Sequence, residues 1–395
     1  MNALYRELLL AILRNMFDKK YTLPRSKSIG TPELLSRAWK KLHLDLPLLL
    51  GLFLLTFLGL IILYSAGNKD LSLFMHQLTS FVLAFAVMLL FANISPYSYQ
   101  RIAPWLFLLG FLLLAAVLGI GVISKGAQRW LSLGLVRFQP AEIMKLAMPM
   151  MLAWYLRDKT LPIKTTDFLV CSAILLLPVL MIFKQPDLGT AIIVAATGIF
   201  VLLLAGITWK LFFSILTLFF VIAPVAWHFM HSYQKARILT MFAPEKDPLG
   251  TGYNIIQAKI AIGSGGLLGK GWLHGTQAHL QFLPEHATDF IFAVCGEEFG
   301  LLGCLVLLAV LLYIVGRCFY ISATSQDTFC RLLAGSITLT FFISFFINIG
   351  MVIGILPVVG VPLPLVSYGG SSLISFMASF GIIMSVRTHR KFIEL

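Results

Sequence analysis

The sequence contains about ten apolar runs, and each is close to the roughly 20 residues that a helix needs to cross a bilayer. Of the 395 residues, 59% are hydrophobic and 12% are charged, which lies far outside the usual composition of a soluble globular domain. We therefore expect an all-α polytopic membrane protein with about ten transmembrane helices. The runs fall near residues 46–66, 73–92, 102–123, 140–156, 166–183, 188–206, 210–230, 289–315, 332–354 and 368–386.

By composition the chain divides into a short polar segment and a membrane domain. Residues 1–45 are basic and polar, with a role that the sequence leaves open, and the runs with their connections fill residues 46–395. Because the first long run begins only near Leu46, we expect no cleavable signal peptide. One connection is much longer than neighbouring helices require: residues 231–288 form a long outer, periplasmic loop between helices seven and eight, a length typical of functional loops.

Basic residues set the expected orientation. With a cytoplasmic N-terminus, most Lys and Arg residues fall on the cytoplasmic side, so the positive-inside rule predicts that both termini are cytoplasmic. Eleven basic residues nevertheless fall in outer loops or outer helix ends, which indicates an anionic ligand at the outer face. They are Lys69, Lys125, Arg129, Arg137, Lys145, Lys184, Lys235, Arg237, Lys246, Lys259 and Lys270.

The net charge of +13 does not indicate nucleic acid, because the basic residues are spread between apolar runs rather than gathered on one soluble domain. They are typical of topology signals and of contacts with anionic membrane lipid. The five cysteines form no Cys-x-x-Cys pair, and no His lies at metal-ligand spacing, so the sequence predicts neither a disulfide framework nor a metal site.

The most informative stretch runs from Gly269 to Gly300, where a polar, Gly-rich loop turns into an apolar run at Asp289. Carboxylates at membrane depth are costly, so each is a candidate functional residue. The same position also suits an acid that caps a helix N-terminus. The local pattern does not separate a catalytic from a capping role for Asp289.

Other polar positions lie in short outer segments. Glu142 and Lys145 are three residues apart and are expected to form an ion pair on one helix face. Lys184 and Asp187 flank Pro186 in a short turn, and Ser367 follows three prolines that forbid a regular helix. Such non-helical backbone is tolerated at membrane depth only where it is buried in protein or lines a wet cavity. The glycines before Lys270 allow either a flexible turn or close approach to a phosphate.

These residues suit a substrate with a long apolar tail and a pyrophosphate. Cations at the outer face would stabilise the charge of a departing lipid pyrophosphate during glycosyl transfer. The acceptor hydroxyl needs a general base, for which Asp289 is the candidate. One carboxylate suffices, because pyrophosphate leaves without the acid catalyst that hydrolysis of an ordinary glycoside needs. A divalent cation that assists the pyrophosphate is compatible with this chemistry.

Several long motifs resemble the shape, elongation, division and sporulation family. They include KGAQRW with RFQPAEIMK, QPDLGT, DPLGTGYNIIQAKIAIGSGG through GKGWLHGTQ to TDFIFAV, GEEFGLLG and PVVGVPLPLVSYGGSSL, in unbroken order from about Leu44 to the C-terminus. The variants around Asp289 and in the last loop are similar to the elongation branch rather than the division branch.

The resemblance implies a ten-helix peptidoglycan glycosyltransferase in the bacterial inner membrane, which polymerises lipid II with inversion at the donor sugar. It implies a class B penicillin-binding protein as the partner transpeptidase within an elongation complex, and it places the family's essential loop aspartate at Asp289. Candidate substrate-binding residues are Lys125, Gln128, Arg129, Glu142, Lys145, Lys184, Lys270, His274 and Ser367.

Two other functions are compatible with parts of the pattern. A flippase for the lipid-linked precursor would use a charged cavity, but charged residues would then be expected through the midplane of several helices. Here they concentrate at the outer ends. A non-catalytic scaffold would leave the outer cations unexplained.

Overall fold

The computed structural model describes residues 43–124, 127–133, 136–208, 211–214, 217, 221, 227–228, 232–246, 252–280, 282 and 285–389. The chain divides into two compact units, Met1–His43 and Leu44–Leu395, and every element below belongs to the second. Most of the predicted N-terminal segment, residues 1–42, lies outside the described residues.

The described part of the second unit is mostly helical, as the apolar runs predict. Its helices follow the runs closely at both ends of the chain. They are α3 (Leu46–Ala66), α4 (Leu71–Asn93), α5 (Pro96–Ile120), α6 (Pro140–Leu156), α7 (Thr165–Lys184), α8 (Leu188–Ala205), α10 (Ser232–Phe242), the short 3-10 helix η1 (Pro244–Lys246), α11 (Tyr253–Gly265), α12 (Thr276–His279), α13 (Ile291–Ala323), α14 (Thr328–Ile353) and α15 (Gly370–Thr388).

Eight of the described helices are long and apolar enough to cross a membrane. They are α3, α4, α5, α7, α8, α13, α14 and α15. A ninth, α6, coincides with the predicted run 140–156 but has 17 residues. Most of the predicted run 210–230 lies outside the described residues. The polytopic membrane fold is thus confirmed, and the count of ten stays a prediction.

One predicted loop contains a small sheet that the sequence analysis did not anticipate. Strands β1 (Val122–Ser124), β2 (Ala127–Leu133) and β3 (Val136–Phe138) pair antiparallel in chain order. Trp130 is opposite Val122, and Leu131 is opposite Phe138. Arg129 lies on the central strand, β2, which contacts both α5 and α6.

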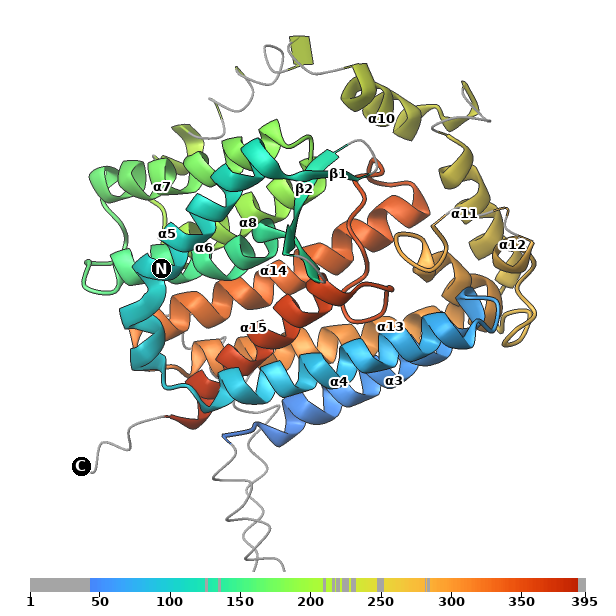
Figure 1. Ribbon diagram of the computed structural model, residues 1–395, viewed down its shortest axis with the longest axis horizontal. Coiled ribbons are helices and arrows are strands. Elements are labelled where there is room, and N and C mark those ends of the chain that lie inside the picture. Colours follow the sequence, from blue (N-terminus) through green and yellow to red (C-terminus); the bar gives the residue numbers. More distant parts are fainter. Residues whose placement is uncertain are drawn as a thin grey trace, which may run out of the picture. The chain divides into compact units, whose positions relative to one another are not determined.

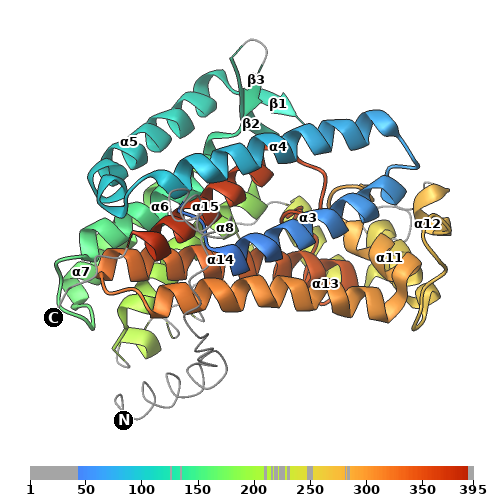
Figure 2. The same cartoon turned by 90° about the horizontal axis from the view of Figure 1, so that it is seen from below.

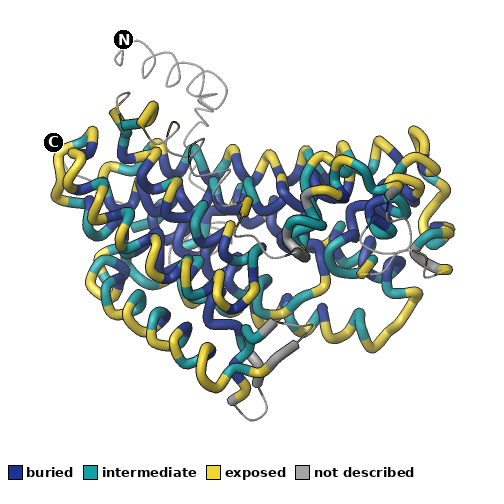
Figure 3. Tube along the Cα trace, turned by 90° about the horizontal axis from the view of Figure 1, so that it is seen from above, coloured by how far each residue is buried: buried dark blue, intermediate teal, exposed yellow. Residues whose placement is uncertain are grey.

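Helices α14 and α15 lie in the middle of this unit, with α3, α4 and α13 along one side and α5 to α8 along the other (Figures 1 and 2). Most of α14 and α15 is buried, whereas less than a quarter of α4 and of α5 is buried. Figure 3 shows the buried residues gathered inside the bundle and the exposed ones along its rim. Apolar side chains on that rim suit a lipid surrounding.

Where the helices pass closest, small residues allow it. Gly381 of α15 faces α4 so closely that an added Cβ atom would lie 2.4 Å from the carbonyl oxygen of Met88 and 2.8 Å from the Cβ atom of Phe91. Close approach of backbones is the usual reason for glycine at helix contacts in membranes. The α4–α15 contact therefore depends on this residue.

We expect Gly381→Ala to destabilise the detergent-solubilised protein, because the methyl group forces α4 and α15 apart. Overpacking of this kind costs about 1–3 kcal/mol. Gly316→Ala on α13 is the matched control, since a Cβ atom there meets nothing within 4 Å. Thermal unfolding followed by circular dichroism compares the two, and equal melting temperatures would show that the α4–α15 contact is loose.

Candidate active site

Asp289 lies in a turn that precedes α13. Residues 285–290 form turns, the helix begins at Ile291, and its N-cap position belongs to Phe290, with no side-chain cap. The hydroxyl of Thr288 donates to the carboxylate and the carbonyl of Glu285 instead of capping the helix. The structure therefore does not support a capping role for Asp289. The residue is half-buried.

The turn is joined to the loop between α14 and α15. The amide of Tyr368 donates to the carbonyl of Ala287 over 2.9 Å. The hydroxyl of Ser367 donates to the carbonyl of Thr288 and accepts from the amide of Leu363. Ser367, predicted to bind substrate, is buried and holds the turn that carries Asp289.

Gly360 in the same loop lies beside the carboxylate of Asp289. An added Cβ atom at Gly360 would be 3.5 Å from Oδ2 of Asp289. Gly360 has φ +78°, a conformation that side chains other than glycine disfavour. The backbone of this loop thus forms one side of the site.

The next group of residues surrounds Asp187, the N-cap residue of α8. Its carboxylate accepts from the amide and the hydroxyl of Thr190, which explains why α8 begins there. It also accepts from Nε2 of Gln139 over 2.8 Å and lies 3.4 Å from Nη1 of Arg129. Asp187 is buried, so its charge needs these partners. The predicted neighbour Lys184 is exposed, and Asp187 pairs with Arg129 instead.

The Asp187 group and the Asp289 turn are joined through the last loop. A Cβ atom at Gly189, two residues after Asp187, would lie 2.9 Å from the carbonyl oxygen of Val359 and 3.6 Å from that of Gly360. Helix α8 therefore packs directly on the loop segment that borders Asp289. The motifs that carry Arg129, Asp187, Gly360 and Asp289 are far apart in the chain and meet in one region.

The predicted ion pair between Glu142 and Lys145 is present. Lys145 Nζ lies 2.7 Å from Oε1 of Glu142, and the hydroxyl of Ser375 on α15 donates to the other oxygen. Both side chains are largely buried. Gln139, one turn earlier, is the residue that binds Asp187, so this pair adjoins the Asp187 group.

Lys270 and His274 lie in a separate cluster, at a break in α13. Gly300 is non-helical there, with φ 64° and ψ −161°. The amides of Lys270 and Gly271 donate to the carbonyls of Glu297 and Glu298, and the amides of Leu301 and Leu302 donate to the Gly-rich loop. The glycines before Lys270 therefore approach the backbone of α13.

Charge in this cluster is balanced by Glu297, which is fully buried. Its carboxylate lies 2.6 Å from Nζ of Lys270 and accepts from the amides of Thr276 and Gln277. His274 Nδ1 bonds to the carbonyl of Trp272, whose indole donates to Ile61 on α3. Lys270 thus joins the loop to α13 and Trp272 joins it to α3, whereas His274 bonds within the loop.

The remaining predicted residues are placed as follows. Gln128 donates to the carbonyl of Gly121 and holds the start of the small sheet. Lys125 lies outside the described residues. Among the residues that the structure does describe, no three His, Cys, Asp or Glu side chains form a group suited to a metal ion.

Sequence reasoning missed Gln139 and Gly360, and also Asn348 of α14. Gln139 stands in the RFQPAE motif beside residues that were singled out, so its motif was a usable signal. Asn348 is the one amide side chain in an apolar run whose other polar side chains are hydroxyls, and polar residues within spans are themselves such a signal.

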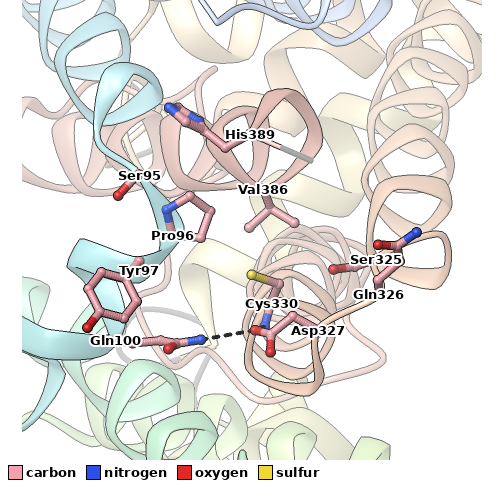
Figure 4. A pocket seen from close by; sticks show the side chains of 10 residues that line it. All are labelled: Ser95, Pro96, Tyr97, Gln100, Ser325, Gln326, Asp327, Cys330, Val386 and His389. Atoms are coloured by element: carbon pink, nitrogen blue, oxygen red, sulfur yellow. Dashed lines mark hydrogen bonds between the residues drawn. The ribbon is translucent and has the colours of Figure 1, made fainter. Parts of the chain in front are cut away.

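A cavity of about 720 Å³ lies at the other ends of α13, α14 and α15 (Figure 4). Tyr97 and His389 are among its lining residues. Nε2 of Gln100 donates across it to Oδ2 of Asp327 over 3.0 Å. The cavity lies at the C-terminal end of α13, whereas Asp289 lies just before its N-terminal end. The cavity is therefore remote from the carboxylate and is not part of the candidate site.

The fold and site together define a polytopic membrane protein in which a turn between helices carries a half-buried carboxylate and is joined, through the last loop, to the group of Arg129 and Asp187. The FtsW/RodA/SpoVE profile of cell cycle proteins matches residues 39–392. The chain belongs to this family, as its motifs predicted.

Relatives and solved structures agree with this assignment. The chain is 49% identical to peptidoglycan glycosyltransferase MrdB of Escherichia coli K12, over 90% of this chain and 96% of that protein. It is 37% identical to MrdB of Helicobacter pylori, over 90% and 92%. A chain from a peptidoglycan synthase complex, solved to explain the coordination of polymerization and crosslinking, matches with a TM-score of 0.78 and 29% identity over 87% and 97%. Thermus thermophilus Rod shape determining protein RodA gives 0.67 and 26% over 88% and 98%.

We expect Gly360→Ala to lower catalytic turnover, because a Cβ atom strains the loop at this positive φ and a relaxing loop would shift beside the carboxylate of Asp289. A residue other than glycine at such a backbone conformation costs on the order of 1–3 kcal/mol. Gly369→Ala is the control in the same loop, since its backbone is extended and a Cβ atom meets nothing within 4 Å. Initial rates at saturating substrate measure the effect, and equal rates for both variants would remove Gly360 from the site.

Proposed function

We propose that this protein is a peptidoglycan glycosyltransferase that polymerises lipid II into glycan strands during cell elongation. The observation that carries the proposal is the 49% identity to a peptidoglycan glycosyltransferase along nearly the whole of both chains. The protein is an integral inner-membrane protein. We further propose that both termini are cytoplasmic, so that Asp289 faces the periplasm, as the distribution of Lys and Arg supports.

In this proposal Asp289 is the general base. The acceptor hydroxyl gives its proton to the carboxylate, and its oxygen forms a bond to the anomeric carbon of the donor. The bond between that carbon and the pyrophosphate breaks on the opposite face, and the electron pair leaves with the pyrophosphate. Support comes from the place of Asp289 in a turn, half-buried and outside any capping role.

Arg129 is our main candidate for binding the pyrophosphate. Nη1 of its guanidinium pairs with the carboxylate of Asp187. Its buried Nε has no hydrogen-bond partner among the described residues. An arginine can offer further N–H groups to a phosphate in a fixed geometry. Lys145 and Lys270 already have carboxylate partners, so we propose that they shape the site electrostatically. Lys125, Gln128, Glu142, Lys184 and His274 stay candidates for substrate contact.

The partner we propose is a class B penicillin-binding transpeptidase. The likeness to a chain from a synthase complex that coordinates polymerization with crosslinking supports it. Glycan strands made by one subunit are the substrate that a transpeptidase crosslinks, so the two activities belong in one assembly.

We expect Asp289→Asn to lose glycan polymerisation by about 10²–10⁴-fold, the range for loss of a general base. Melting temperature should stay near that of the wild type, because asparagine keeps the size and hydrogen-bonding capacity of the side chain and the N-cap position of α13 belongs to Phe290. Purified protein in liposomes with lipid II and the partner, followed by gel analysis of glycan, measures this. Glu285→Gln, an exposed acid in the same turn, is the control.

The same assay separates the alternatives. Wild-type levels of polymer from Asp289→Asn would contradict the assignment of the base. A flippase would instead be favoured if the wild-type protein moved lipid II between the leaflets of the liposome and made no glycan polymer, whichever way it was inserted.

A further inference from the structure

Two stretches of non-helical backbone meet at the candidate site: the turn 285–290 and the loop 354–369. Backbone groups at membrane depth need partners within the protein, because the bilayer offers none. Three buried polar side chains supply them, namely Gln77 of α4, Asn348 of α14 and Ser367 of the loop itself. Their hydrogen bonds go to backbone groups of these two stretches.

Asn348 differs from the other two because it binds the acid's own residue. Its Nδ2 donates to the carbonyl of Asp289 and to the carbonyl of Val361, both over 2.8 Å. Both partners are acceptors, so only the amide nitrogen can make these bonds. One planar group therefore fixes the distance between the backbone of Asp289 and the backbone of Val361.

Val361 follows Gly360, the residue that lies beside the carboxylate. The amide of Asn348 thus holds both sides of the site: the residue that carries the carboxylate and the loop that borders it. Helix α14 supplies a fixed frame, since Asn348 is fully buried and lies within the last two turns before Ile353. A small shift of this frame would move the carboxylate relative to Gly360.

The cost of this arrangement points to the same role. Oδ1 of Asn348 is buried and has no hydrogen-bond partner among the described residues. A buried acceptor left in this state is destabilising, because it has lost its hydrogen bonds to water. An apolar residue at this position of α14 would avoid that cost but would release both carbonyls.

We propose that Asn348 is a positioning residue for the reaction, which acts by holding Asp289 and the Gly360 loop at a fixed separation. The inference rests on the proposed role of Asp289 as the base. Asn348 does not touch substrate in this proposal, and its effect on the rate passes through the carboxylate.

The fold has other anchors for the same segments. Ser367 binds the carbonyl of Thr288, Tyr368 binds that of Ala287, and Gln77 binds the backbone of Ser367 and Gly369. Loss of Asn348 therefore leaves the turn attached to the loop. The expected defect is misplacement of the carboxylate rather than unfolding.

Asn348→Asp gives a test that depends on protonation. The side chain keeps its size, but an ionised carboxylate has no donor and faces two carbonyl oxygens, while the neutral acid can donate to one of them. Burial and the two facing carbonyl oxygens favour the neutral acid over the ionised carboxylate. The neutral form grows as pH falls, so the activity of this variant relative to wild type should rise from pH 8.5 to pH 5.5.

The full set is Asn348→Asp, Asn348→Leu and the control Ser344→Ala, assayed for glycan polymer from lipid II at several pH values with melting temperatures. Ser344 is a buried polar residue one turn earlier, whose hydroxyl bonds only to its own helix at Thr340. We expect Asn348→Leu to lose at least 10-fold in kcat at every pH with KM within about twofold, in line with the cost of misplaced catalytic groups. Ser344→Ala should retain the wild-type kcat.

Wild-type kcat in Asn348→Leu, or a ratio for Asn348→Asp that does not change with pH, overturns the positioning role. If Asn348→Leu does not fold, the pH dependence of Asn348→Asp decides alone. Asp289→Asn run in parallel keeps the two proposals apart. If Asp289→Asn is active, the proposal that Asp289 is the general base is wrong. If Asp289→Asn is inactive but the Asn348 variants are fully active, only the positioning role of Asn348 is wrong.

Discussion

Backbone hydrogen bonding inside the membrane domain governs the rest of this structure. A helix satisfies its own peptide groups, but the candidate site consists of turns and loops that cannot. The turn before α13 and the loop after α14 therefore bond to each other and to Ser367, Asn348 and Gln77. The break in α13 is handled in the same way, with peptide groups of the Gly-rich loop replacing those that the helix loses at Gly300. Ser367, which the sequence singles out as a candidate for substrate binding, therefore serves backbone hydrogen bonding first.

Charge is balanced locally as well. Arg129, Lys145 and Lys270 each lie near a buried carboxylate, on Asp187, Glu142 and Glu297 respectively. A buried carboxylate without a partner is costly, so each cation stabilises the acid beside it. The positive field around the candidate site is therefore smaller than the number of Lys and Arg residues predicted for the outer face suggests. Arg129 keeps unused donor capacity, which distinguishes it from the two lysines.

The apolar runs predicted the helices well, because length and hydrophobicity decide which segments cross a bilayer. The ion pair of Glu142 and Lys145 was also predictable, since its spacing is local. Pairs such as Arg129 with Asp187, or Asn348 with Asp289, join residues more than 50 positions apart, and no local pattern reveals them. The capping role of Asp289 failed as an interpretation because the helix starts two residues later than the acid. The small sheet was missed because its strands are short and stand among loop residues.

The break at Gly300 has an electrostatic consequence for Lys270. Peptide dipoles add along a continuous helix, and their sum leaves partial negative charge on the last carbonyls. Because α13 is interrupted, its first arm ends at Gly300, and the carbonyls of Glu297 and Glu298 form a negative pole inside the domain. Lys270 sits at this pole with its amide and its ammonium group both engaged. A helix that ran straight through would have no such pole for the lysine to neutralise.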